Sequence, residues 1–363
     1  MTELDDFSRR IRDAASPEDV FGALAGDQLA AARKIYRRLA RIAHADHYVT
    51  EREKQLAHEA FVKLSALWTQ CQARIQSGFY GTNQTSAPLG TVLSSAHAYT
   101  LEALHQRGEL SNVYQAVDEN NQPRLVKVAL ARSVNDLLKA EAHTLQYLAK
   151  KLHDASVSNF IPALQESFQV SVDNAIHLHV NVFDYATTFR SLTEVMAEYP
   201  NGVNSRHFVW IYKRLLSLLG AVHDAHCIHG AVLPTHVLVE PATHAILLVD
   251  WCFAVKPDHA ACAMSNAYRS WYPPEVIARK KLTPATDLYM AARCMTYALG
   301  GDNGDVPRHV PERFRRVLAP CLLGNPAYRS QDAWELYNEL DVAARVVYGN
   351  AQYEPLVMPA LEA

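Results

Sequence analysis

The sequence lacks any long hydrophobic run. Its longest apolar stretches, Leu215–Val222 and Ala245–Val249, fall well short of the roughly 18 residues that a membrane-spanning helix needs. The N-terminus is polar and acidic, with Glu3, Asp5 and Asp6, so we expect neither a signal peptide nor a transit peptide. Both absences argue against a membrane protein and predict a cytoplasmic one.

An excess of charge of one sign is also missing. The 35 Lys and Arg residues nearly balance the 38 Asp and Glu residues, and the net charge is -3. This balance argues against a nucleic-acid coat protein and against a binder of strongly anionic membranes, so neither partner is expected. None of the 6 cysteines forms a Cys-x-x-Cys pair, which argues against a zinc ribbon and favours a reducing compartment such as the cytoplasm.

The sequence has 363 residues, of which 49% are hydrophobic, and this is enough to form the hydrophobic cores of two domains. From about Ser16 to Ile75 the sequence shows helical periodicity without strand-like alternation, which predicts a helical module over residues 1–76. Two apolar stripes recur at three- and four-residue spacing, Leu29, Ala32, Ile35, Tyr36, Leu39 and Ile42, then Leu56, Ala60, Phe61, Leu64, Leu67, Trp68 and Cys71. The polar break His44–Thr50 between them predicts a helical hairpin, with Thr50 as the N-cap of the second helix.

Residues 77–96 are rich in Gly, Ser and Thr, a composition that predicts a linker. Beyond it, strands are predicted first and helices dominate after Phe208. The predicted strands are Tyr99–Ala103, Val113–Val117, Leu125–Leu130, Ile176–Val182, Val237–Val239 and Ile246–Val249. This order indicates an α+β domain over residues 97–350, with a small sheet-rich lobe (about 97–185), a larger helical lobe (about 186–350) and an extended tail, 351–363.

The motifs of this domain, in their order, resemble those of a protein kinase. Kinases hold ATP with a Gly-rich loop, a strand lysine, a helix glutamate and an aspartate for magnesium. Here the loop spans Gln106–Tyr114, and the segments that follow contain Leu125-Val126-Lys127, Glu141, the hinge Phe183–Ala186 and Asp250. The resemblance implies a bilobal protein-kinase-like fold that binds ATP and Mg²⁺, with Asp250 as the metal ligand. The implied nucleotide-binding residues are Gly108, Val113, Lys127, Glu141, Asp184, Leu238 and Asp250.

The segment that resembles the catalytic loop, Cys227–Val239, departs from the family pattern in its chemistry. Ala231 stands where the family has the aspartate base, and an alanine cannot accept a proton. His236 stands where the family has the asparagine that holds a second magnesium ion, and Trp251-Cys252 follows Asp250 in place of Phe-Gly. Later matches, Tyr272–Glu275, Asp287 and Arg329, are architectural. The resemblance therefore implies a kinase fold with no intact catalytic set.

Residues 1–76 resemble a J-domain, the module that stimulates the ATPase of a DnaK-type chaperone. The segment Ile35–Asp46 is similar to its second helix and the loop that follows. His44 and Asp46 of the family's His-Pro-Asp motif are present, while Ala45 replaces the proline. The resemblance implies a chaperone-binding surface formed by Arg37, Arg38, Arg41, His44 and Asp46, which would meet an acidic partner by charge complementarity.

Three functions remain open on these grounds. The first is a catalytically impaired kinase homologue (a pseudokinase) that acts as a scaffold or nucleotide-gated adaptor. The second is an enzyme with a rearranged site, a serine/threonine kinase-like phosphotransferase or a nucleotidyl transferase, since positioning and electrostatics do much of the work in phosphoryl transfer. The third is a co-chaperone of a DnaK-type ATPase that uses the kinase fold to dock clients.

Overall fold

The computed structural model describes residues 3–14, 17–22, 24, 28–43, 48, 50–76, 89–152, 155–173, 176–186 and 188–358. The chain is a mixed α+β protein that divides into two compact units, Met1–Ala87 and Pro88–Ala363. Among the described residues, no helix combines the length and apolar character that crossing a membrane requires.

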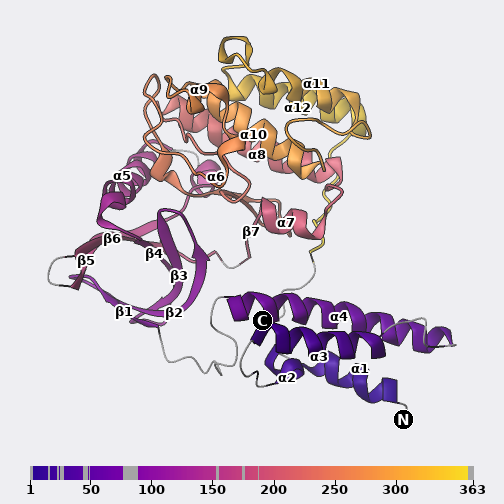
Figure 1. Ribbon diagram of the computed structural model, residues 1–363. Helices are drawn as coiled ribbons and strands as arrows, with labels where there is room; N and C mark the ends of the chain where they lie inside the picture. Colours follow the sequence, from indigo (N-terminus) through magenta and orange to yellow (C-terminus); the bar gives the residue numbers. More distant parts are fainter. Residues whose placement is uncertain are drawn as a thin grey trace. The chain divides into compact units, whose positions relative to one another are not determined.

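The first unit is helical (Figure 1): α1 (Glu3–Asp13), α2 (Pro17–Phe21), α3 (Gln28–Ile42) and α4 (Glu51–Gln76). The two predicted stripes form α3 and α4, which pack against each other and stack Tyr36 on Trp68 with ring centroids 5.0 Å apart. Helix α1 was not predicted, although Leu4, Phe7 and Ile11 bury one face of it in the same core.

Helix α4 begins at a capping box, as Thr50 predicted. The amide of Glu53 donates to Thr50 Oγ1 at 3.2 Å, and the amide of Thr50 donates to Glu53 Oε2 at 3.3 Å. This reciprocal pair satisfies two amides that a helix start leaves without partners. The predicted chaperone-binding residues His44 and Asp46 lie outside the described residues.

The second unit opens with a curled antiparallel sheet in the strand order β1-β2-β3-β4-β6-β5 (Figure 1). Helix α5 packs on β5 and β6. The elements are β1 (Gly90–Leu93), β2 (Ala98–Arg107), β3 (Ser111–Asp118), β4 (Pro123–Ala129), η2 (Arg132–Val134), α5 (Asn135–Lys151), α6 (Ala155–Ser158), β5 (Leu164–Asp173) and β6 (Ile176–Asp184).

Two of these strands depart from the sequence expectations. Strand β1 lies inside residues 77–96, predicted as a linker, because Thr91 and Val92 pair with Thr100 and Tyr99 of β2. Strand β5 was not predicted, and its pairing with β6 places it at the edge of the sheet. Both edge strands mix polar and apolar residues, so their composition resembles that of loops.

The rest of the unit is mainly helical, around a core that includes Phe208, Tyr212, Trp251 and Phe314. Strands β7, β8 and β9 form a small antiparallel sheet. The elements are β7 (Arg190–Ser191), α7 (Leu192–Glu198), α8 (Ser205–Asp224), β8 (Val237–Val239), β9 (Ile246–Leu248), η3 (Trp251–Phe253), η4 (Arg269–Trp271), α9 (Pro274–Ile277), α10 (Pro284–Ala298), α11 (Glu312–Leu318), η5 (Ala319–Leu322), η6 (Pro326–Tyr328) and α12 (Ala333–Tyr348).

The described part of the predicted tail, residues 351–358, contains neither helix nor strand. It nevertheless packs against the domain, since Leu356 is buried and its amide donates to the carbonyl of Pro241 at 3.0 Å. Burial of this one leucine ties the segment to the second unit.

Candidate functional site

A cleft of about 470 Å³ collects residues from both the sheet and the helical part of the second unit. Val113 and Lys127 come from β3 and β4, Glu141 from α5, and Leu238 from β8. Six of the seven residues predicted to bind nucleotide line this cleft: Val113, Lys127, Glu141, Asp184, Leu238 and Asp250. The cleft thereby brings together Val113 and Asp250, which are 137 residues apart in the sequence.

Gly108, the seventh predicted residue, does not line the cleft but forms the turn between β2 and β3. Its amide donates to the carbonyl of Ser111 at 3.0 Å. A Cβ atom at this position would lie 2.6 Å from that carbonyl oxygen, closer than real Cβ atoms come to other atoms. Glycine is therefore required by the turn itself, whatever the turn covers.

Lys127 joins two carboxylates at the deep end of the cleft. Its Nζ donates to Glu141 Oε1 at 2.8 Å and also binds Asp250 Oδ1. The lysine is 4% exposed and Glu141 is 2% exposed, so little water screens these ion pairs. The backbone at Asp250 has φ = 64°, a left-handed turn directly after β9 that is uncommon for a residue other than glycine.

The pKa values in this cluster follow from burial and charge. Burial alone would lower the pKa of Lys127, but the carboxylates of Asp250 and Glu141 raise it well above its usual value. Burial would likewise raise the pKa of Asp250, yet Lys127 and His236 together hold it well below its usual value. Lys127 and Asp250 are therefore a charged pair at neutral pH.

Asn181 on β6 supports the cluster and was missed by sequence reasoning. Its amide donates to Glu141 Oε2 at 2.9 Å and to the carbonyl of Leu138 at 2.9 Å, while Ser167 Oγ donates to its Oδ1 at 2.8 Å. The alternation in this strand indicated a polar, half-exposed face, but Asn181 is fully buried. Its only sequence signal was a polar residue opposite Lys127 in the predicted sheet.

The loop that contains Ala231 is held by Asp287, a buried residue in the first turn of α10. Its carboxylate accepts the amides of His229 and Gly230, both at 2.8 Å, and lies 3.0 Å from His223 Nε2. Ala231 is fully buried and offers only a methyl group. The side chain at this point of the loop therefore cannot take part in proton transfer.

His236 connects this loop to Asp250. Its Nδ1 lies 2.8 Å from the carbonyl oxygen of Ala231, and its Nε2 lies 3.1 Å from Asp250 Oδ2. Carbonyl and carboxylate oxygens both accept hydrogen bonds, so the ring bridges two acceptors in this arrangement. Both oxygens of Asp250 are thus bound by nitrogen donors, Oδ1 by Lys127 and Oδ2 by His236.

A possible metal-ligand group overlaps the cluster. Ligand atoms of Glu141, Asp250 and Cys252 lie within 4.8 Å of one another. Lys127 binds two of these three residues, and burial raises the pKa of the Cys252 thiol well above its usual value. Mg²⁺ prefers an octahedral set of oxygen ligands, whereas this set offers a protonated thiol and two carboxylates that are already paired. The donor set does not suit Mg²⁺.

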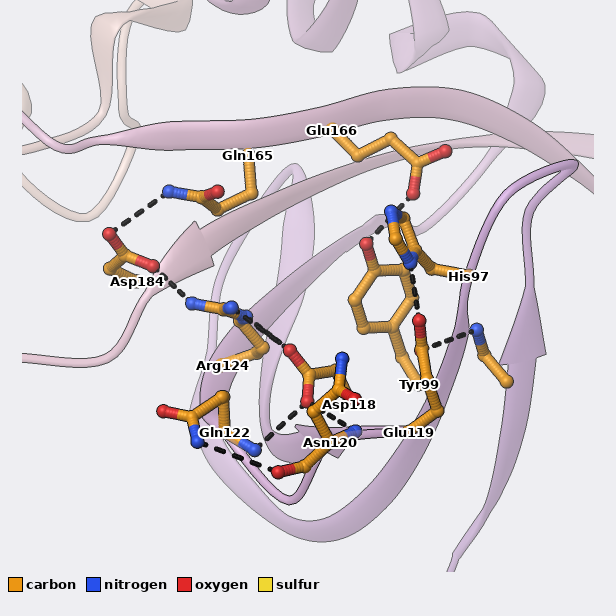
Figure 2. A network of polar contacts seen from close by, with 11 residues as sticks. His97, Tyr99, Asp118, Glu119, Asn120, Gln122, Arg124, Gln165, Glu166 and Asp184 are labelled. Carbon is orange, nitrogen blue, oxygen red and sulfur yellow. Dashed lines mark hydrogen bonds and ion pairs between the residues drawn. The ribbon is translucent and has the colours of Figure 1, made fainter.

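Asp184, at the end of β6, lines the cleft, and Figure 2 shows its polar contacts. Arg124 pairs with its carboxylate and also with Asp118, whose Oδ2 lies 2.9 Å from Arg124 Nη2. Gln165 Nε2 donates to Asp184 Oδ2 at 3.0 Å. On the same sheet, the hydroxyl of Tyr99 donates to Glu166 at 2.8 Å (Figure 2). Because Arg124 is shared with Asp118, it balances only part of the negative charge of Asp184; together the contacts fix the end of β6.

Of the predicted chaperone-binding residues, Arg37, Arg38 and Arg41 are exposed on α3. A scan against protein-family models and a search of curated proteins gave no match to this chain. The resemblances to a kinase and to a J-domain therefore rest on the motifs quoted above.

Proposed function

We propose that the second unit is a protein-kinase-like domain with a small sheet-rich lobe and a larger helical lobe, and that it binds a ligand without transferring phosphate. The observation that supports this most strongly is that Lys127 forms ion pairs with both Glu141 and Asp250 in one cleft. The three residues come from three separate segments of the chain. This trio is the one that the kinase resemblance pairs. A buried lysine between two carboxylates, with strongly shifted pKa values, is also typical of functional sites.

The proposed loss of catalysis follows from Ala231 and His236. Ala231 removes the proton acceptor, and His236 binds Asp250 in place of an asparagine that would hold a metal ion. The domain then acts as an adaptor whose cleft senses an adenine-type ligand. No disulfide joins the six cysteines, all of which are among the described residues, and this agrees with our proposal of a reducing, cytoplasmic setting.

Two measurements on the full chain test this proposal. Thermal unfolding with adenine nucleosides and nucleotides should show a raised Tm for at least one of them, because a ligand that binds only the folded state stabilises it. Incubation with γ-labelled ATP should leave no label on the protein or on a generic substrate. Label that appears in the parent chain and disappears in Asp250→Ala would favour the phosphotransferase or nucleotidyl transferase reading instead.

We further propose that the first unit is a J-domain-like module that contacts a DnaK-type chaperone. The exposed arginines Arg37, Arg38 and Arg41 on α3 support this, since a basic helix face suits an acidic chaperone surface. The full chain should stimulate the ATPase of such a chaperone, and Arg38→Ala and His44→Gln should each reduce the stimulation. Arg52→Ala, which removes an exposed cation from α4, is the matched control. Stimulation that His44→Gln leaves unchanged would contradict a J-type contact.

A further inference from the structure

We infer that the cleft accepts a flat, uncharged ligand of the nucleoside class, without phosphate groups and without a divalent metal ion. The inference rests on the proposed kinase-like function and narrows the ligand of that same cleft. It follows from how the charged groups around the cleft are already used.

The first step concerns the cations. Lys127, the lysine that a phosphate would need, is bound by Glu141 at 2.8 Å and by Asp250. Arg190, the other cation that lines the cleft, donates Nη1 to the carbonyl of Phe189 at 2.7 Å. A phosphate would reach only the one Nζ hydrogen that these two ion pairs leave, and it would lie beside the carboxylates of Glu141 and Asp250, which repel it.

The second step concerns the metal ion. Lys127 and His236 occupy both oxygens of Asp250. His236 is itself held in place by the carbonyl of Ala231 at 2.8 Å. A magnesium ion would have to compete with a nitrogen at whichever oxygen of this carboxylate it approaches. Without a metal ion, the charge of a triphosphate would be left uncompensated.

The third step is the sum of charge along the cleft. Its lining contains four acidic side chains, Glu141, Asp184, Glu194 and Asp250, against the two cations Lys127 and Arg190. Glu194 caps α7 by accepting the amide of Ser191 at 2.7 Å, so it is fixed at the mouth. An anion that approaches this opening meets a surface that carries more negative than positive groups, and such a surface repels it.

A fourth observation concerns the turn between β2 and β3. Under the kinase hypothesis, this turn would cover the phosphates of a nucleotide. Glu109 in this turn accepts the amides of Asn266 and Ala267, at 2.9 and 3.0 Å. The contact ties the turn to the segment before η4 and fixes a carboxylate within the turn itself. The same turn keeps a single glycine, Gly108, so few backbone amides are open to an anion.

The apolar part of the cleft has the opposite character. Val113, Leu125, Phe183 and Leu238 line it, and the hydroxyl of Tyr185 is fixed by Gln115 Nε2 at 2.7 Å. Apolar walls with a few placed polar groups are typical of sites for flat heteroaromatic ligands. A nucleoside buries its base in such a site and needs no cation.

Isothermal titration of the full chain with adenosine and with ATP, each in EDTA and in excess Mg²⁺, tests this inference. We expect adenosine to bind equally in both buffers, and ATP to bind more weakly than adenosine by about tenfold or more, a difference of about 1.4 kcal/mol. Val113→Phe, which fills the apolar part, should abolish adenosine binding. Val117→Phe on the same strand and face, outside the cleft, is the matched control and should bind normally.

Tighter binding of ATP in Mg²⁺ than of adenosine would overturn the inference and leave the proposed nucleotide-binding domain intact. Binding of neither ligand in either buffer would overturn both. If Val113→Phe fails to fold, the wild-type comparison of the two ligands in the two buffers still decides the question.

Discussion

Arg329 and Glu275 form a buried ion pair in the helical part of the second unit. Arg329 Nη1 donates to Glu275 Oε1 at 2.6 Å and Nη2 donates to Oε2 at 3.2 Å, with both side chains almost fully buried. We expect Arg329→Met to lower the free energy of unfolding by about 3–5 kcal/mol, because it leaves the Glu275 carboxylate buried without a cation. Chemical denaturation of the variant and the parent measures this difference.

The exposed pair of Arg316 with Glu312, at 2.5 Å, is the control for that experiment. Arg316 is 74% exposed, so Arg316→Met should change the free energy of unfolding by less than about 1 kcal/mol. The double variant Glu275→Leu/Arg329→Met should recover much of the loss. Equal losses for Arg329→Met and Arg316→Met would contradict the assignment of Arg329 as a buried structural cation.

Two buried histidines predict a loss of stability in mild acid. His207 Nδ1 lies 2.8 Å from His244 Nε2, with Arg214, Tyr353 and Glu354 as the neighbouring titratable groups. Burial, followed by the charges of His207 and Arg214, lowers the pKa of His244 to about 4. The folded chain therefore keeps His244 neutral, while the unfolded chain takes up a proton below about pH 6.5.

The free energy of unfolding should accordingly be highest above pH 6.5 and fall as the pH drops toward 4, by up to about 1.4 kcal/mol per pH unit for each such histidine. His244→Asn should reduce this slope, because asparagine takes up no proton in this pH range. Asparagine also tolerates the φ of 57° at this position, so the backbone need not change. Some slope should persist, because burial also lowers the pKa of His229 to about 4. An identical pH profile for the parent and His244→Asn would contradict the prediction.

At the scale of elements, the long periodic segments were predictable and the edge strands were not. Helices α3 and α4 follow stripes that recur at helical spacing, and β3 and β4 follow runs of strand-forming residues. Strand β1 lies in a segment whose composition is typical of a linker, and β5 mixes polar and apolar residues. Edge strands depend on pairing with a neighbour, and a neighbour cannot be read from the segment itself.

One turn and one loop of the second unit are linked by a single side chain. Glu109 binds the amides of Asn266 and Ala267, although all three residues are exposed. We expect Glu109→Ala to increase hydrogen exchange at these two amides by about tenfold, since a lost charge-assisted hydrogen bond corresponds to about 1.5 kcal/mol or more.

Glu102→Ala on β2 is the matched control, because Glu102 is an exposed glutamate on the strand that leads into the same turn. It should leave exchange at Asn266 and Ala267 unchanged. Unchanged exchange in Glu109→Ala as well would show that the turn and the loop are not coupled in solution.

At the scale of the whole molecule, the order of motifs along the chain grouped seven residues, of which six line the cleft and Gly108 does not. It did not predict how they are bound. That Lys127 contacts both Glu141 and Asp250, and that His236 occupies the second oxygen of Asp250, depends on distances between segments that only the fold sets. Asn181 was missed for the same reason, since its burial depends on the packing of α5 against β6.

Two compact units on one chain suit an adaptor. A ligand-sensing domain joined to a chaperone-contacting module would hold both bound partners at a high effective concentration. This argument depends on the cleft of the second unit being a ligand site.

The measurement that tests this claim most directly is hydrogen exchange of the full chain with and without saturating adenosine. The account predicts slower exchange in β3, in residues 183–186 and in β8–β9, with no change in α3 or α4. Protection by adenosine confined to other parts of the chain, or no protection by adenosine anywhere, would contradict it.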